Sequence, residues 1–296
     1  MSGAGRDASC VLPGGRVLEY WDGGDPGGRS VVLQPGTPAS RILGRWGHEA
    51  AAAAGVRLVA VNRPGYGGST PSAAPSLRAT GRDTAALAAL LGLQDYAVLG
   101  ISGGGPFAVA TAVADPVAVH AVAVVGGVGP WRDLDEPTEE DIEERGCLDL
   151  LDAGDVAGAE AGLRRIAERE WGGMRGLDDG ARVDEMLAGP DSSVSPLTRD
   201  DDYRALWAAS TALLLDRLDG YLCDCLAWGG TWDVDPSEVV APTLVWDAEG
   251  AGARHGRWYA ERIVDSELVL FPGESHLDVC DSHWPEVLAG LLRVWA

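Results

Sequence analysis

Ser102 stands in a segment suited to nucleophilic catalysis, Gly-Ile-Ser-Gly-Gly at 100–104. An apolar, strand-like run at 96–99 precedes it, and an Ala-rich, helix-like stretch at 105–114 follows. A serine on a sharp strand-to-helix turn exposes its hydroxyl, and small residues two positions before and after it accommodate the strained backbone. The helix that follows directs the positive end of its dipole at the serine. This pattern predicts that Ser102 is a nucleophile.

His276 is the predicted partner of this serine. An activated serine needs a base within hydrogen-bond reach, and the chain holds five histidines. Only His276 lies in a glycine-containing loop after a late strand-like run, at 267–271. Open α/β sheets gather their sites at the carboxyl ends of strands, so this loop is well placed, although a surface histidine is the alternative. His48 and His255 fall in helix-like segments, where we expect surface or packing roles.

The segment Gln-Pro-Gly-Thr-Pro at 34–38 supplies the expected oxyanion site. It follows the strand-like run 30–33. In acyl transfer, two backbone N–H groups must face the oxygen that becomes negatively charged. We predict that these are the N–H groups of Thr37 and of Gly103, the residue after the nucleophile. The alternative is that the segment is only a proline- and glycine-rich turn.

Strand-like and helix-like segments alternate around these residues. Strands are expected at 16–21, 30–33, 56–62, 96–99, 120–125, 243–246 and 267–271, the first as part of an N-terminal hairpin. Helices are expected over 42–54, 77–91, 105–114, 255–263 and 285–295. Such alternation predicts an α/β fold with a mostly parallel sheet.

The segment 131–235 breaks this rhythm. It contains no strand-like run and is acidic and helix-like. We therefore predict a helical lid inserted after the sixth strand, with 1–130 and 236–296 forming the core. The insertion is rich in tryptophan, and Trp131, Trp207 and Trp228 are candidates for contact with an apolar substrate. The alternative for each is packing of the lid against the core.

Together these segments resemble the α/β-hydrolase superfamily, in particular bacterial esterase, lactonase and aminopeptidase-like members with HGTPGS, DRPGYGxS and SGGGP motifs. The chain has QPGTPAS at 34–40, NRPGYGGS at 62–69 and ISGGGP at 101–106. The likeness extends from about residue 16 to the C-terminus except for the insertion, which resembles the lid of that family. It implies an α/β-hydrolase fold with a serine nucleophile, and neither a metal ion nor an organic cofactor is implied.

The chain departs from this pattern at three places. Pro35 stands where the family has histidine and Asn62 where it has aspartate, and we expect both changes to remove polar groups from the rim of the site. The acid that orients the histidine normally lies in a loop after the strand at 243–246, which reads roughly His-Gly-Glu-x-Asp. Here the loop is DAEGAGA at 247–253, and an ungapped comparison places Ala251 at the acid position.

Three outcomes are open for this acid. Asp247 or Glu249 reaches His276 from a rearranged loop, and Asp247 is favoured because it directly ends the strand. A carboxylate elsewhere, such as Asp278 or Asp133, takes the role. Otherwise the site works as a Ser–His dyad, and loss of the acid lowers the rate about 10⁴-fold in the serine proteases.

The composition of the chain limits the classes of molecule that we expect it to bind. The formal net charge of −22 predicts that the chain binds neither nucleic acid nor anionic membranes. No run approaches the roughly 18 apolar residues of a membrane span, and no signal peptide is evident. The five cysteines show no zinc-type spacing, so we expect free thiols, no metal and a cytoplasmic location. A homodimer is left open as the assembly state.

These observations predict serine hydrolase-type acyl chemistry on an ester, lactone or thioester of a fairly large, apolar small molecule. Ser102 would attack the carbonyl and His276 would act as the base. The first alternative is a non-hydrolytic cyclase, lyase or isomerase of secondary metabolism that uses His276 and the oxyanion site for proton transfer. The second is a ligand-binding pseudo-hydrolase, which would have no need for Ser102, His276 and the glycines of the turn together.

Overall fold

Eight strands form one sheet within the residues that the computed structural model describes, which are 5–135, 141–188, 195–250 and 253–295. Their order is β1-β2-β4-β3-β5-β6-β7-β8. β1 and β2 pair in antiparallel fashion, as do β2 and β4, and all other neighbours are parallel. The predicted α/β fold with a mostly parallel sheet is therefore confirmed. The strands are β1 (Arg6–Val11), β2 (Val17–Gly24), β3 (Arg29–Gln34), β4 (Val56–Val61), β5 (Tyr96–Ile101), β6 (Val119–Val125), β7 (Thr243–Ala248) and β8 (Ser266–Phe271).

The central strands are buried on both faces, as parallel strands covered by helices are. Every residue of β5 and of β7 is buried. Alternate residues of one strand enter different cores: Val31 and Leu33 belong to one hydrophobic cluster and Val32 to another. This burial explains why the strands are continuous apolar runs in the sequence.

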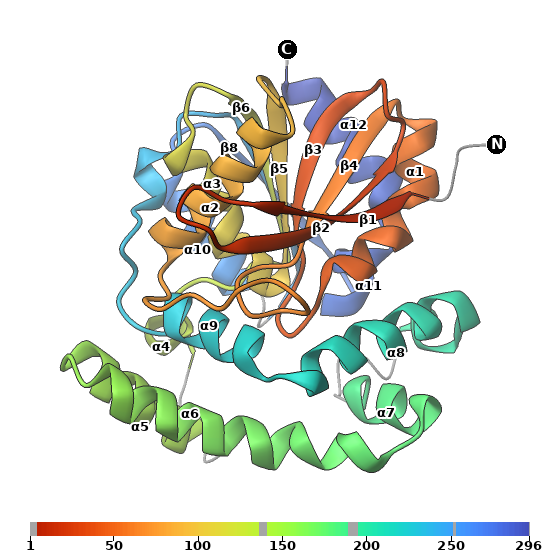
Figure 1. The fold of residues 1–296 in the computed structure, drawn as a ribbon. Coiled ribbons are helices and arrows are strands. Elements are labelled where there is room, and N and C mark those ends of the chain that lie inside the picture. The colour runs from red at the N-terminus through yellow and green to blue at the C-terminus, as the bar shows by residue number, and fades with distance from the viewer. Residues whose placement is uncertain (1–4, 136–140, 189–194, 251–252, 296) are drawn as a thin grey trace.

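Helices cover the two faces of this sheet (Figure 1). One face carries α1 (His48–Ala53) and α12 (Trp284–Val294), which share a core with β3 and β5. The other carries α2 (Leu77–Leu90), α3 (Gly105–Ala114) and α10 (Ala253–Arg262). The α/β layers therefore hold the carboxyl end of β5, and Ser102 directly after it, in a rigid frame.

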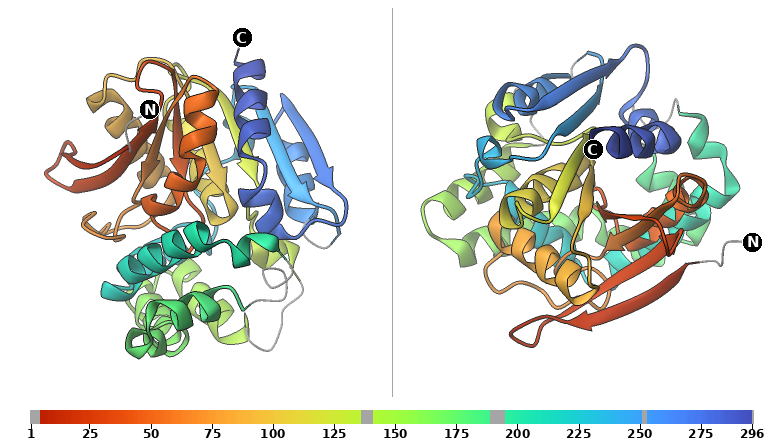
Figure 2. Two further views of the ribbon diagram at one scale, coloured as in Figure 1. Left: turned by 90° about the vertical axis from the view of Figure 1, so that its right-hand side faces the viewer. Right: turned by 90° about the horizontal axis from the view of Figure 1, so that it is seen from above.

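Between β6 and β7 the described residues form helices and no strand. Figure 1 shows these helices gathered at one end of the sheet, and the views in Figure 2 show them lying outside the α/β layers. Every helix in the described part of the chain is too short or too polar to cross a lipid bilayer. The helices are α4 (Trp131–Leu134), α5 (Asp141–Asp152), α6 (Val156–Glu170), η3 (Gly172–Gly176), α7 (Asp179–Met186), η4 (Pro196–Arg199), α8 (Asp201–Asp216), α9 (Asp219–Trp228) and η5 (Pro236–Glu238).

The predicted helix over 42–54 is wrong in its first half. That half is a 3₁₀ helix, η1 (Arg41–Gly47), and α1 begins only after it. Glycine disfavours an α-helix interior, and Gly44 is needed for close packing. A Cβ at Gly44 would lie 2.4 Å from the Ala60 Cβ of β4. The close contact of Gly44 with the sheet therefore accompanies a 3₁₀ helix in place of the expected α-helix.

The loop predicted around His276 is also partly wrong, because His276 is the first residue of a helix, α11 (His276–Asp281). Ser275 and Asp278 form a capping box. The Ser275 hydroxyl accepts a hydrogen bond from the Asp278 amide, and the Asp278 carboxylate accepts one from the Ser275 amide, each at 3.2 Å. This cap fixes the start of the helix and with it the backbone of His276.

Candidate active site

Ser102 has a strained backbone at the end of β5. Its φ is 51°, and no other non-glycine residue in the described chain has a positive φ. Such a conformation costs on the order of 1–3 kcal/mol and persists where the surrounding structure enforces it. A Cβ at Gly100 would lie 2.6 Å from the Gly104 carbonyl oxygen, so this turn needs glycine there. The short η2 (Ser102–Gly104) then leads into α3. This is the geometry of a nucleophile elbow.

The His276 imidazole reaches the Ser102 hydroxyl. Nε2 of His276 lies 3.0 Å from Oγ of Ser102, within the range for general-base catalysis. Cys280, one helical turn after His276, places its Sγ 3.6 Å from the same nitrogen. Burial raises the pKa of the Cys280 thiol well above its usual value. The thiol therefore stays protonated at neutral pH, which makes it a poor nucleophile beside Ser102.

The loop after β3 packs against the nucleophile turn. A Cβ at Gly103 would lie 3.0 Å from the Thr37 amide nitrogen and 2.5 Å from its Oγ1. A Cβ at Gly36 would lie 3.4 Å from the Ser102 Cβ. Thr37 and Gly103 thus pack against each other beside Ser102. That they bind an oxyanion stays a prediction.

A buried arginine connects this loop to the helical insertion. Arg63, in the turn after β4, is 1% exposed. Its guanidinium donates to the Pro35 carbonyl and, at 2.8 Å, to the Gly36 carbonyl. It also forms a bidentate ion pair with Asp224 of α9, with N–O distances of 2.9 and 2.6 Å. The guanidinium lies 4.7 Å from the centre of the Phe107 ring.

Asp224 lies at the centre of the same network. Its carboxylate accepts hydrogen bonds from the Thr37 hydroxyl at 2.6 Å and from the Tyr66 hydroxyl at 2.8 Å. Burial lowers the pKa of Arg63, but the nearby Asp224 charge outweighs this and the net shift is upward. Arg63 is therefore charged, and it and Asp224 together hold the Thr37 side chain beside the nucleophile turn.

Sequence reasoning missed this ion pair. Arg63 belongs to the Arg-Pro-Gly-Tyr-Gly turn, which served only as a mark of family likeness. Asp224 lies in the stretch 220–227 of α9, where every residue is buried. A carboxylate in such a buried stretch needs a cationic partner, so the sequence indicates that a partner exists. It does not indicate that the partner is Arg63, which lies 161 residues away in the chain.

Asp247, the predicted acid, is held by backbone amides. One carboxylate oxygen accepts from the Ala248 amide at 2.8 Å and the other from the Gly256 amide at 2.9 Å. These two amides are the hydrogen-bond donors to the Asp247 carboxylate within the described part of the chain. Its role as partner of His276 stays a prediction. Ala251, at the expected acid position, lies outside the described residues.

The other carboxylates considered for this role lie elsewhere. Asp278 accepts hydrogen bonds from the hydroxyls of Ser195, at 2.5 Å, and Ser275, at 2.7 Å. Asp133 belongs to the short helix α4 at the start of the insertion. Asp278 thus serves the cap of α11 and its contact with the insertion.

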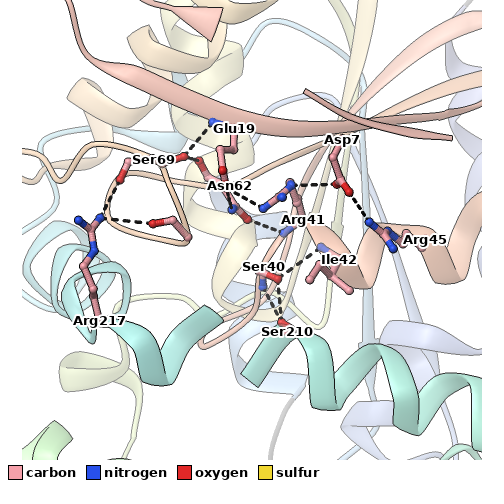
Figure 3. Close-up of polar contacts among 11 residues, drawn as sticks. Asp7, Glu19, Ser40, Arg41, Ile42, Arg45, Asn62, Ser69, Ser210 and Arg217 are labelled. Carbon is pink, nitrogen blue, oxygen red and sulfur yellow. Dashed lines mark hydrogen bonds and ion pairs between the residues drawn. The ribbon is translucent and has the colours of Figure 1, made fainter. Parts of the chain in front are cut away.

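Asn62 is not at the rim of the site, as the sequence suggested, but fully buried. Figure 3 shows it at the centre of a polar cluster. Its amide oxygen accepts from the Arg41 backbone amide at 2.7 Å, and its amide nitrogen donates to the Glu19 carboxylate at 2.9 Å. Asparagine suits this position because one side chain must both accept and donate. Pro35 is buried as well, with its carbonyl bound by Arg63.

Two further contacts in Figure 3 tie the insertion to the core. The Ser40 amide donates to the hydroxyl of Ser210 in α8 at 2.9 Å. Arg217, directly after α8, donates to the carbonyls of Gly67 and Ser69 at 3.3 and 3.4 Å. The insertion is therefore fixed to the loops after both β3 and β4.

A cavity of about 350 Å³ opens beside Ser102 and His276. Its wall is mostly apolar, and the insertion contributes Trp171 and Trp207. Of the predicted substrate contacts, Trp207 therefore lines this cavity. Trp131 and Trp228 line a separate cavity of about 630 Å³, which Trp171 also borders. The other large apolar side chains that line the cavity beside Ser102 are Leu33, Leu43, Ile101, Met186, Leu187, Leu277 and Trp284.

Comparisons with known proteins agree with this architecture. The family model described as the alpha/beta hydrolase fold matches residues 29–147. No curated protein matches the chain in sequence. An alpha/beta hydrolase fold protein from Nakamurella multipartita shares 24% identity with a TM-score of 0.66, over 98% of this chain and 100% of that one. A bromoperoxidase from Bacillus anthracis shares 21% identity with a TM-score of 0.67, over 97% and 100% of the two chains.

A thermophilic esterase from Thermogutta terrifontis is also similar, at 18% identity and a TM-score of 0.64, over 98% of this chain and 97% of that one. Identities this low establish a shared fold and leave the reaction open. The sheet order, the elbow at Ser102 and the family model agree with one another. The chain therefore has the α/β-hydrolase fold, and its residues 29–147 match the model of that family.

Proposed function

We propose that this protein is a serine hydrolase that acts on an ester, lactone or thioester of a fairly large, apolar small molecule. Ser102 attacks the carbonyl carbon while His276 Nε2 takes the hydroxyl proton. The negative charge forms on the carbonyl oxygen, beside the amides of Thr37 and Gly103. The protonated His276 then gives its proton to the leaving group, and water, activated by the same imidazole, releases the acyl group.

The observation that carries this proposal is the 3.0 Å contact between His276 Nε2 and Ser102 Oγ at a strained elbow. A nucleophile and a base within hydrogen-bond reach are what covalent acyl chemistry requires. The apolar cavity beside them supports an apolar substrate. Names of similar proteins, which include an esterase, are consistent with the same reaction class.

A fluorophosphonate probe tests the mechanism, because it reacts with activated serines. We expect stoichiometric labelling of the wild type at Ser102, located by peptide mapping. Ser102→Ala should abolish labelling and His276→Ala should slow it at least 100-fold, since general-base catalysis contributes roughly 10²–10⁴-fold. Replacement of the exposed Ser282 by alanine serves as the matched control and should label like the wild type. An unlabelled wild type would refute the proposal.

A second candidate is a non-hydrolytic reaction in which His276 transfers a proton. The favouring observation is that the Asp247 carboxylate accepts its hydrogen bonds within the described part of the chain from two backbone amides. A substrate already activated for proton transfer demands less of the imidazole than an unactivated ester does. Turnover that survives Ser102→Ala but not His276→Ala would select this candidate. Ligand binding that is unaffected by either change, without turnover, would select a binding protein.

A further inference from the structure

Asp281 is an anomaly in the wall of the active-site cavity. The side chains that line this cavity beyond Ser102, His276 and Thr37 are mainly aliphatic or aromatic. Among the described lining residues, Asp281 is the one carboxylate, and no arginine takes part. It ends α11, the helix that begins with His276. The proposed base and this carboxylate are thus on one rigid element, separated by roughly 7.5 Å along the helix axis.

The contacts of Asp281 leave its charge without a cationic partner. The Tyr203 hydroxyl of α8 donates to Oδ2 at 2.6 Å. The side chain is 8% exposed, and no cationic group of the described chain contributes to its environment. Burial raises the pKa of Asp281 to about 6, against side-chain hydrogen bonding by Tyr203 and Trp284, which lowers it. The carboxylate is therefore ionised at pH 7.5, and its donors in the described part of the chain are neutral.

A buried charge is unfavourable unless it is paired. Asp224 follows that rule, because it is 1% exposed and is paired with Arg63. Asp247, also buried, accepts hydrogen bonds from two backbone amides, and Asp281 likewise has neutral donors. Asp281 differs from both because it lines a cavity, and a cation that enters the cavity would complete its pairing.

We infer that the cavity accepts substrates whose apolar acyl group ends in an ammonium group, and that Asp281 binds this group by an ion pair. The inference rests on the proposed serine chemistry and makes its substrate class more specific. Asp281 is a specificity-determining residue in this arrangement. Tyr203 holds its carboxylate in place, and the apolar wall accommodates the chain between the carbonyl and the ammonium group.

Two isosteric probes test the inference, p-nitrophenyl 6-aminohexanoate and p-nitrophenyl heptanoate, which differ by an ammonium in place of a methyl group. For each enzyme the measured quantity is the ratio of kcat/KM for the two probes at pH 7.5. We expect Asp281→Asn to lower this ratio at least tenfold, mainly through KM of the ammonium ester. Glu267→Gln is the control. It removes an exposed carboxylate that does not line the cavity, and its ratio should stay within threefold of the wild-type ratio.

Three results would overturn the inference. The first is a wild-type ratio at or below one. The second is an equal loss for both probes in Asp281→Asn, which would make the Asp281–Tyr203 contact a structural link only. The third is an equal gain for p-nitrophenyl 6-hydroxyhexanoate, which would assign recognition to a neutral donor instead of a cation.

A binding experiment separates this inference from the serine mechanism. Calorimetry with n-hexylammonium chloride needs no turnover and can be done in the Ser102→Ala background. We expect binding in Ser102→Ala and at least tenfold weaker binding when Asp281→Asn is added. Binding of this kind with no fluorophosphonate labelling would refute the proposed function and keep the cation site. Labelling of the wild type, together with hexylammonium binding that Asp281→Asn does not change, would keep the proposed function and refute the cation site.

Discussion

At the scale of single residues, buried polar side chains match the hydrogen-bond donors and acceptors around them. Asn62 accepts from the Arg41 amide and donates to Glu19, so it satisfies two buried groups of opposite kind. The carboxylate of Asp247 satisfies two amides with two oxygens. A chemically similar side chain with a different balance of donors and acceptors leaves a buried group unsatisfied.

Asn62→Asp tests this balance. The new carboxylate keeps an acceptor for Arg41 but faces Glu19 without a donor and with like charge. We expect a loss of about 1–3 kcal/mol in the free energy of unfolding, measured by urea denaturation. Glu19→Gln in the same chain restores a donor, so the double variant should be more stable than the sum of the two single changes predicts. Simple additivity would contradict this account of the cluster.

Asp247→Asn tests the effect of pH. Burial raises the pKa of Asp247 to about 6 from 3.8, against the amides of Ala248 and Gly256, which lower it. Because the folded-state pKa is the higher one, the folded protein binds the proton more tightly, and this group makes stability fall as pH rises from about 4 to about 6. The variant should therefore gain about 3 kcal/mol on the wild type across that window, measured by urea denaturation.

The same variant tests catalysis. We expect kcat on a p-nitrophenyl ester to fall roughly 10⁴-fold, as it does when a catalytic acid is lost, because the two amides leave acceptor capacity on the carboxylate for His276. A much smaller loss would show that Asp247 is not the acid. A stability difference that is constant with pH would show that Asp247 titrates normally.

At the scale of elements, the site is assembled where the helical insertion meets two loops of the sheet. α9 supplies Asp224, the turn after β4 supplies Arg63, and the loop after β3 supplies the carbonyls and the Thr37 hydroxyl that they bind. Part of the insertion is thus a structural support of the predicted oxyanion site. Rigid support of this kind is what preorganised electrostatic stabilisation requires.

Asp224→Asn tests that support. It leaves the Arg63 charge buried without its counterion, so we expect a loss of about 3–5 kcal/mol in the free energy of unfolding. Removal of the exposed pair through Glu267→Gln should cost at most about 1 kcal/mol, because the Glu267 and Arg293 side chains are 53% and 59% exposed. Both values come from urea denaturation.

An apolar replacement of both partners separates stability from positioning. Arg63→Met with Asp224→Leu removes both charges, and such replacements often restore stability. The double variant still lacks the arginine donors to Pro35 and Gly36. We therefore expect recovered stability but a fluorophosphonate labelling rate at least tenfold below that of the wild type. Full recovery of the labelling rate would show that the network is only structural.

On the scale of the whole molecule, charge is the dominant feature. The chain has 45 acidic and 23 basic residues and a formal net charge of −22. A large net charge destabilises the compact state through self-repulsion. Many exposed ion pairs, such as Arg169 with Glu143, offset little of it.

The melting temperature should consequently rise with ionic strength. Screening shortens the Debye length from about 30 Å at 0.01 M salt to about 10 Å at 0.1 M, which weakens repulsion between distant surface charges. We expect an increase of a few degrees between 0.01 and 0.5 M sodium chloride, measured by circular dichroism. Potassium chloride should have the same effect, because the cause is general screening. A decrease would mean that the ion pairs outweigh the net repulsion.

The sequence by itself determined seven of the eight strands of the described sheet, the helices that cover its faces and the residues of the elbow, because these depend on local signals. Continuous apolar runs mark buried parallel strands, and glycines mark the turn at Ser102. The same signals predicted His276 and the loop of Thr37, although the helix that begins at His276 was missed because its Ser275 cap was overlooked. Only the tertiary structure decided the partners of Arg63, Asn62 and Asp281. Each contacts residues far away in the chain, and which residues meet depends on how the insertion packs across the sheet, a property that no local pattern encodes.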